Sequence, residues 1–173
     1  MELFDLYDDE RNFTGETIER GKPLPENRYH LVIHICIFGS DGKMLIQQRQ
    51  PFKKGFPDKW DISVGGSAVA GENSRQAASR ELYEELGISH DFSHDCPMLT
   101  VHFERGFDDV YVIHKDIAVS ELRLQKCRRR SGRTEMKYIR LSTAAHLYRT
   151  IKAILICCST TEQKEVTFQR SKT

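Results

Sequence analysis

The chain has 173 residues, of which 39% are hydrophobic and 29% are charged. This composition can form the core of one domain and argues against wholesale disorder. No segment approaches the roughly 20 consecutive apolar residues that span a bilayer, and the acidic N-terminus lacks the pattern of a secretory signal. We therefore expect a cytoplasmic protein, and the five cysteines, which form no C-x-x-C pair, are expected to be reduced thiols.

The net charge of +1 conceals an uneven distribution of charged residues. Residues 1–122 contain 13 basic and 22 acidic residues, a net charge of −9. Residues 123–173 contain 13 basic and 3 acidic residues, a net charge of +10. We therefore divide the chain into a core, residues 1–122, and a basic C-terminal segment, residues 123–173, which either completes the domain or forms an atypical tail.

The strand signals are runs of β-branched and apolar residues separated by turn-forming residues. In chain order, the predicted strands span residues 30–38, 43–49, 60–64 and 110–113. Gly39-Ser40-Asp41-Gly42 supplies the first turn, and the stretch 50–59, which contains proline and glycine, is predicted to be a loop.

One helix is predicted over residues 75–86, which are mostly good helix formers. Asn73 or Ser74 can cap its start, and Gly87 suits the left-handed conformation that ends a helix. The apolar residues that recur every four positions and would face the core are Ala78, Leu82 and Leu86. A second helix is predicted over residues 147–158 from a similar spacing. Strands on both sides of a helix indicate a mixed α/β domain.

The most informative pattern is Gly66-x5-Glu72-x7-Arg80-Glu81-Leu82-x-Glu84-Glu85-x-Gly87-Ile88. Glu81, Glu84 and Glu85 stand at i, i+3 and i+4, so they share one face of the predicted helix. Adjacent carboxylates repel one another, and a divalent cation converts that repulsion into a binding site. Oxygen ligands one helix turn apart suit Mg²⁺ or Mn²⁺, which keep several waters and take further ligands from phosphate.

Three glutamates on one helix face, taken alone, more often form a solvated acidic surface than a metal site. The other positions of the pattern overturn that interpretation. Ordinary residue frequencies predict a chance match to all nine specified residues in about one protein in ten million. At every specified position from residue 66 to residue 88, the chain resembles the signature of the Nudix hydrolase family.

This resemblance implies an α/β/α sandwich around a mixed sheet. It also implies a metal-dependent pyrophosphohydrolase that cleaves a diphosphate linkage in a nucleoside diphosphate-X or similar small substrate. Glu81, Glu84 and Glu85 would hold the catalytic Mg²⁺ or Mn²⁺, and one of them would provide or orient the base for the attacking water. Arg80 would pair with this acidic cluster, and Glu72 would maintain the geometry of loop and helix through Arg80.

We call residues 66–88, which carry the family signature, the Nudix box. The resemblance also implies roles for residues around this box. Gly65 or Gly66 would let a backbone carbonyl approach a metal, because neither carries a Cβ. The residues that would contact the substrate's diphosphate are Arg49, Lys53, Lys54 and Lys59, although the same loop is equally typical of a basic solvated surface. An extra metal-binding carboxylate from outside the box would come from Glu104, Asp108 or Asp109.

The flanks of the box resemble a narrower group of Nudix proteins, those related to isopentenyl-diphosphate isomerase. The residues that carry this likeness are Asp5-Leu6-Tyr7-Asp8, Tyr29-His30-Leu31, Gln48-Arg49 and the stretch from Lys53 to Trp60. An isomerase is therefore the alternative function. It is disfavoured because Gly65 stands where the isomerases place a catalytic cysteine, and Ser67 where they place a metal-binding histidine. A Nudix domain that binds its ligand without cleavage is a third hypothesis, against which the complete set of box carboxylates argues.

Three ring-bearing side chains near the predicted site are interpreted as structural. Trp60 is expected to belong to the core rather than to a platform for base stacking, given its place at a strand start. His30 and His34 lie on one face of the same predicted strand, and we expect both to be hydrogen-bonded core histidines.

Residues 126–133 form a basic run that departs from the family's pattern. One hypothesis is an arm that contacts RNA or another polyanion. The other is a tail altered by divergence or a change of reading frame, and the abrupt shift in composition without interleaved aromatic residues favours it. We therefore expect a small diphosphate-containing molecule, rather than nucleic acid, as the partner of this protein.

Overall fold

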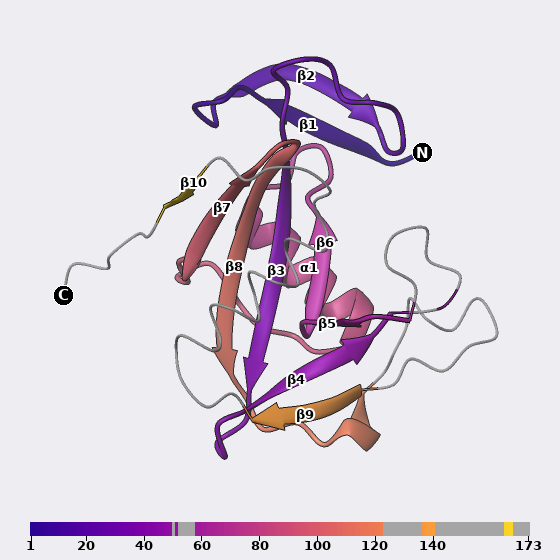
Figure 1. Ribbon diagram of the computed structural model, residues 1–173, viewed down its shortest axis with the longest axis vertical. Helices are drawn as coiled ribbons and strands as arrows, with labels where there is room; N and C mark the ends of the chain where they lie inside the picture. Colours follow the sequence, from indigo (N-terminus) through magenta and orange to yellow (C-terminus); the bar gives the residue numbers. More distant parts are fainter. Residues whose placement is uncertain (50, 52–57, 123–135, 141–164, 168–173) are drawn as a thin grey trace.

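The computed structural model describes residues 1–49, 51, 58–122, 136–140 and 165–167. Within these residues the chain forms an eight-stranded mixed sheet, a separate two-stranded hairpin and one α-helix (Figure 1). The hairpin consists of β1 (Leu3–Tyr7) and β2 (Phe13–Glu19), and the helix is α1 (Ser74–Leu86). The strands of the sheet are β3 (His30–Phe38), β4 (Lys43–Gln48), β5 (Trp60–Asp61), β6 (Val64–Ser67), β7 (Leu99–Phe103), β8 (Gly106–His114), β9 (Met136–Arg140) and β10 (Glu165–Thr167).

The parallel strands β3 and β8 form the centre of the sheet, paired in register from His30 with Gly106 to Phe38 with His114. Two strands share the other edge of β3. Residues 32–35 pair with β6, and Phe38 pairs with the start of β4. The sheet therefore splits beside β3, with β6 on one side of the split and β4 on the other (Figure 1).

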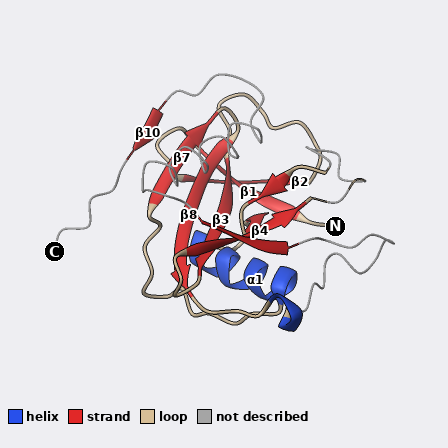
Figure 2. Ribbon diagram, turned by 60° about the horizontal axis from the view of Figure 1, so that its bottom comes forward, coloured by secondary structure: helices blue, strands red, loops and turns tan. Residues whose placement is uncertain are grey.

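Successive side chains of β3 face opposite sides of the sheet, and each side has its own buried cluster. Ile33 and Ile35 pack with Leu82 of α1 in the first cluster. Cys36 and Phe38 belong to the second. α1 covers the first face (Figure 2), and full burial of each isoleucine there stabilises the fold by about 1.5–3 kcal/mol.

The N-terminal hairpin packs at the end of the sheet where β3 begins (Figure 1). Tyr7 and Tyr29 exchange two backbone hydrogen bonds of 2.8 and 3.0 Å. The carbonyl of Leu3 accepts a hydrogen bond from the N–H of Ala70 at 2.8 Å. A carboxylate oxygen of Asp5 also accepts one at 2.7 Å, from the N–H of the next residue in that loop. The hairpin therefore holds the loop between β6 and α1 from the outside.

The predicted mixed α/β class, the strands predicted at residues 30–38, 43–49 and 110–113 and the helix at residues 75–86 are confirmed. The single strand predicted at residues 60–64 is instead two, β5 and β6, and β6 continues through both glycines because their backbones pair with β3. The hairpin, β7, β9 and β10 were not predicted. In the hairpin, β2 is mostly exposed and lacks an apolar pattern.

The predicted C-terminal helix at residues 147–158 and the basic run at residues 126–133 lie outside the described residues. The division of the chain at residue 122 stays a prediction, although β9, which follows it, pairs with β4. Among the described residues, no helix has the length and apolar character needed to cross a membrane.

Candidate active site

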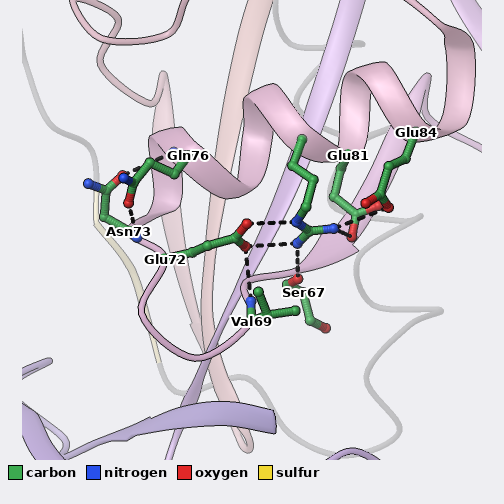
Figure 3. Close-up of polar contacts among 8 residues, drawn as sticks. Ser67, Val69, Glu72, Asn73, Gln76, Glu81 and Glu84 are labelled. Atoms are coloured by element: carbon green, nitrogen blue, oxygen red, sulfur yellow. Dashed lines mark hydrogen bonds and ion pairs between the residues drawn. The ribbon is translucent and has the colours of Figure 1, made fainter. Parts of the chain in front are cut away.

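A capping box fixes the start of α1 (Figure 3). The Asn73 side chain accepts a hydrogen bond from the backbone N–H of Gln76 at 3.0 Å, and the Gln76 side chain accepts one from the backbone N–H of Asn73 at 2.9 Å. The box satisfies two N–H groups that the first turn leaves unpaired. At the other end, Gly87 adopts a φ of 71° and donates its N–H to the carbonyl of Tyr83 at 2.8 Å. The expected cap and helix end are confirmed.

The guanidinium of Arg80 joins α1 to the loop before it (Figure 3). Nε and Nη2 donate to the two carboxylate oxygens of Glu72 at 2.7 and 2.9 Å, and Nη2 also donates to the carbonyl of Ser67 at 3.0 Å. Glu72 accepts a further hydrogen bond from the N–H of Val69 at 3.1 Å. The hydrogen bonds to Glu72, which outweigh partial burial, raise the pKa of Arg80 above its ordinary value, so the guanidinium stays charged.

The same guanidinium contacts two of the three box carboxylates. Nη1 donates to Glu81 at 2.8 Å and to Glu84 at 3.3 Å. The side chain of Glu81 is only 3% exposed, whereas that of Glu84 is 37% exposed. The third carboxylate, Glu85, accepts a hydrogen bond from Nε2 of Gln47 on β4 at 3.2 Å. The acidic face of α1 therefore meets the sheet beside the split between β6 and β4.

The two glycines of β6 make room for polar side chains on opposite faces of the strand. A Cβ on Gly66 would overlap the carboxylate of Glu81. A Cβ on Gly65 would lie 2.6 Å from Cδ2 and 2.7 Å from Nε2 of His34. Real Cβ atoms do not approach other atoms so closely, so neither position accepts a side chain unless its neighbour moves.

His34 forms a buried pair with Asp108 of β8. Its Nδ1 lies 2.7 and 2.9 Å from the two carboxylate oxygens, and less than a tenth of either side chain is exposed. Burial lowers the pKa of His34, but the charge of Asp108 and the hydrogen bond to it outweigh burial, so the pKa is raised overall. The charges of Asp61 and Glu85 act in the same direction, so the imidazole lies within the electrostatic field of the acidic site.

The box carboxylates have the donor chemistry of a site for a hard cation, because they supply oxygen ligands one helix turn apart. Within the described part of the chain, however, no three His, Cys, Asp or Glu side chains are arranged to hold an ion. Glu81 and Glu84 both turn toward Arg80. Glu84 makes the longer contact and is the more exposed, so the donor set fits a divalent cation once Glu84 exchanges its contact with Arg80.

The family model of the NUDIX domain matches residues 28–136, a range that includes the helix, the loop before it and both glycines. This chain belongs to the Nudix family. A Nudix hydrolase of Listeria monocytogenes is 51% identical over 126 residues, which are 73% of this chain and 75% of the relative. The family resemblance drawn from the box and the predicted class of enzyme are confirmed.

Two further comparisons bear on the fold and on the alternative function. The crystal structure of a Deinococcus radiodurans protein has a TM-score of 0.63 and 24% identity, covering 88% of this chain and 90% of that protein. This likeness confirms the Nudix fold. An isopentenyl-diphosphate Δ-isomerase of Streptomyces coelicolor is 32% identical over 87 residues, 50% of this chain and 44% of the isomerase.

The structure places the three candidates for an extra Nudix carboxylate in different surroundings. Asp108 belongs to the buried histidine pair. Asp109 faces the opposite side of β8 and accepts two hydrogen bonds from Arg11, at 3.0 and 2.5 Å, and one from Thr100 at 2.6 Å. Glu104 is exposed in the turn between β7 and β8. Both aspartates are therefore engaged by other side chains, and the extra carboxylate stays a prediction.

The basic residues predicted to contact the diphosphate come from the loop between β4 and β5. Arg49 forms an ion pair of 2.9 Å with Asp61, which is buried. Lys59 is exposed at the base of the loop. Lys53 and Lys54 lie outside the described residues. The structure therefore gives a position to two of the four predicted substrate contacts.

The ring-bearing side chains differ in part from the expectation. Trp60 is half-buried, and Nζ of Lys137 lies 3.7 Å from the centre of its ring. His34 is hydrogen-bonded as expected, but Nδ1 of His30 has no hydrogen-bond partner among the described residues. His30 instead stacks on Phe4 with ring centres 5.3 Å apart, and burial lowers its pKa to about 4.

Three polar contacts of the site were not anticipated from sequence. These are the hydrogen bond from Gln47 to Glu85, the carbonyl of Ser67 as an acceptor for Arg80, and the pairing of His34 with Asp108. Each joins residues that are between 13 and 74 positions apart in the chain. A polar residue on an otherwise apolar strand, as at position 34, was the one sequence signal for such a contact.

Proposed function

We propose that this Nudix chain hydrolyses a diphosphate linkage in a nucleoside diphosphate-X or similar small molecule, with Mg²⁺ or Mn²⁺ as its cofactor. The observation that carries the proposal is the arrangement around Arg80. One guanidinium, anchored on Glu72, contacts both Glu81 and Glu84. The guanidinium gathers these two carboxylates, and a hard cation that took its place beside Glu84 would find oxygen ligands there.

The cation would be held by Glu81, Glu84 and Glu85, together with a backbone carbonyl of Gly65 or Gly66. When bound, Mg²⁺ or Mn²⁺ neutralises phosphate oxygens and lowers the pKa of the attacking water. The burial of Glu81 suits a ligand with a fixed position, and the exposure of Glu84 suits one that turns between Arg80 and the cation. One of the three glutamates accepts the water's proton or orients the group that does.

The substrate's diphosphate would meet the basic loop between β4 and β5. Asp61 orients the guanidinium of Arg49, which can grip phosphate through two parallel hydrogen bonds. Lys59 adds a positive charge at the base of the same loop, and Lys53 and Lys54 are assigned by the family resemblance alone. Gln47, two residues before Arg49, contacts Glu85, so this positive charge would attract the diphosphate toward the cation site.

The isomerase alternative requires an acid at position 65. Gly65 cannot transfer a proton, and the space beside it is taken by the imidazole of His34. At position 67 a serine replaces the metal-binding histidine. The likeness to the Streptomyces coelicolor isomerase therefore covers the scaffold without the acid on which isomerisation depends.

The proposal is tested by measuring the release of phosphate or nucleotide from a panel of substrates, with and without Mg²⁺ or Mn²⁺. The panel contains nucleoside di- and triphosphates, dinucleotides, sugar nucleotides and isoprenoid diphosphates. We expect cation-dependent turnover of at least one class. Conversion of an isoprenoid diphosphate to its isomer without phosphate release would favour the isomerase. Binding without turnover throughout the panel, by folded protein, would contradict hydrolysis and indicate a ligand-binding domain.

A further inference from the structure

Strand β6 passes between two polar side chains, one on each face of the sheet. The register pairs His34 with Gly65 and Ile33 with Gly66. The imidazole of His34 fills the space that a side chain of Gly65 would need, and the carboxylate of Glu81 fills that of Gly66. With no Cβ on either glycine, both groups lie directly against the backbone of β6.

The imidazole is itself held in a fixed orientation. Nδ1 is engaged by both carboxylate oxygens of Asp108, at 2.7 and 2.9 Å, so the opposite edge of the ring, Cδ2 and Nε2, faces Gly65. His34 and Asp108 stand on adjacent parallel strands, β3 and β8, at the centre of the sheet. The side chain of His34 is 8% exposed and that of Asp108 is 5% exposed. The edge of the ring therefore packs against β6 from a buried pair at the centre of the sheet.

The same short strand carries two contacts of the acidic site. Gly66 lies against Glu81, and the carbonyl of Ser67 accepts a hydrogen bond from Nη2 of Arg80 at 3.0 Å. A shift of β6 toward the face of His34 would loosen both contacts together. Glu81 is almost completely buried, so its orientation depends on the groups that pack against it.

Burying an ionisable pair in a protein core costs free energy. The desolvation of two ionisable groups offsets much of their attraction, and apolar residues of similar volume often stabilise a fold as well or better. Stability alone therefore does not account for a His and Asp pair at the centre of this sheet. Groups that orient the ligands of a metal typically change metal affinity or activity by about 10- to 100-fold when they are removed.

We propose that His34, held by Asp108, is a positioning residue for the catalytic carboxylate Glu81. It acts through the backbone of β6, from the face of the sheet opposite α1. The inference rests on the proposed function, in which Glu81 is a ligand of the catalytic cation. It assigns the residue at position 34 a role in the reaction, beyond that of a core histidine.

The test compares kcat and KM for four variants of the full chain. His34→Ala removes the contact, and Gly65→Ala forces a methyl group into the space of the imidazole. We expect each to lower kcat by about 10- to 100-fold while KM changes less than about twofold. In the double variant His34→Ala/Gly65→Ala, the methyl group enters vacated space, so kcat should exceed that of the Gly65→Ala variant and reveal coupling. Cys36→Ala, two residues along the same face of β3, is the matched control and should keep the wild-type kcat.

A second readout is independent of hydrolysis. The ¹⁵N resonance of Arg80 Nε, recorded without added metal, reports on the Glu72 and Glu81 network. We expect it to shift or broaden in His34→Ala and to remain unchanged in Cys36→Ala. An unchanged resonance together with an unchanged kcat in His34→Ala would overturn the inference, as would a loss of activity that only parallels a loss of folded protein. If the wild type hydrolyses nothing, the proposed function fails, and the Arg80 resonance alone decides whether His34 positions the acidic network.

Discussion

Glu72 and Arg80 form a two-point ion pair, with Nε to Oε1 at 2.7 Å and Nη2 to Oε2 at 2.9 Å (Figure 3). The pair joins the end of the loop to the middle of α1, eight residues further along the chain. Since the same guanidinium reaches Glu81 and Glu84 through its third nitrogen, the position of the loop and that of the acidic face are set by one side chain.

Arg80→Lys should therefore weaken both stability and activity, although it keeps the charge. An ammonium group cannot reproduce the parallel hydrogen bonds of the guanidinium. We expect the free energy of unfolding to fall by about 1–3 kcal/mol and kcat to fall about 10- to 100-fold, measured by denaturant titration and steady-state kinetics. Arg20→Lys, in an exposed pair with Glu2, is the control and should change neither. Wild-type stability and activity of Arg80→Lys would contradict the role of the parallel hydrogen bonds between the Arg80 guanidinium and Glu72.

Gly66→Ala should reduce hydrolysis because its methyl group would overlap the Glu81 carboxylate. We expect the displaced carboxylate to lower Mn²⁺ affinity and kcat by about tenfold or more, measured by calorimetric titration and kinetics. The matched control is Gly42→Ala, in the turn between β3 and β4. At position 42 the φ of +73° makes alanine costly in stability, but no neighbouring atom lies within 4 Å of the added Cβ. This control should therefore lower stability and leave Mn²⁺ affinity unchanged. A Gly66→Ala protein with normal Mn²⁺ affinity would show that Glu81 is not a ligand.

Arg11→Met should release the N-terminal hairpin from the sheet. The substitution leaves Asp109, of which 2% of the side chain is exposed, as a buried carboxylate without its cationic partner. We expect the free energy of unfolding to fall by about 2–4 kcal/mol, somewhat less than the roughly 3–5 kcal/mol for a fully buried pair, because the Arg11 side chain is 33% exposed. Arg28→Gln removes a pair with Glu16 of β2, whose side chain is 53% exposed, so no carboxylate is left buried and the denaturation midpoint should stay almost unchanged. Equal effects of the two variants would argue against an anchoring role for Arg11.

His30 should make the fold sensitive to acid. Burial lowers its pKa to about 4, below the value of about 6.5 for an unfolded chain. The stability that depends on the neutral ring is therefore complete above pH of about 6.5 and is lost as the pH falls toward 4. At about 1.4 kcal/mol per pKa unit, the loss in the free energy of unfolding is at most about 3.5 kcal/mol.

The measurement is the denaturation midpoint of the wild type and of His30→Phe between pH 7 and pH 4. His34 contributes in the opposite direction, because its raised pKa favours the folded state at low pH. The difference between the two proteins isolates position 30. We expect His30→Phe to lose less stability on acidification, and the exposed substitution His94→Gln to follow the wild type. Parallel curves for His30→Phe and the wild type would refute the assignment.

The sequence predicted the local features of the site because they depend on neighbouring residues. The box pattern, the cap at Asn73 and the helix end at Gly87 all act within a few turns of one helix, where spacing determines which side chains share a face. The apolar run at residues 30–38 likewise predicted β3. The family model and the Listeria monocytogenes relative confirm what the box implied about family and enzyme class.

The contacts that could not be predicted depend on strand order. His34 and Asp108 are 74 residues apart and meet because β3 and β8 are parallel neighbours, which periodicity alone does not reveal. The N-terminal hairpin was missed because β2 is mostly exposed. The hairpin's backbone contacts to Tyr29 and Ala70 are made by β1, the other strand of the hairpin. The register of the sheet, rather than composition, decides which polar residues become partners.

The metal site on the acidic face of α1 is tested by the rate of hydrolysis as a function of Mg²⁺ concentration, compared between the wild type and Glu84→Gln. Glu84→Gln keeps the shape of the side chain and removes only its charge. We predict a saturable dependence on Mg²⁺ in the wild type and a fall in kcat of about 100-fold or more in Glu84→Gln, with unchanged folding. Glu121→Gln, exposed and distant in sequence from the box, should behave as the wild type. Undiminished turnover by Glu84→Gln, or turnover by the wild type without any divalent cation, would contradict the assignment of the metal site to the acidic face of α1.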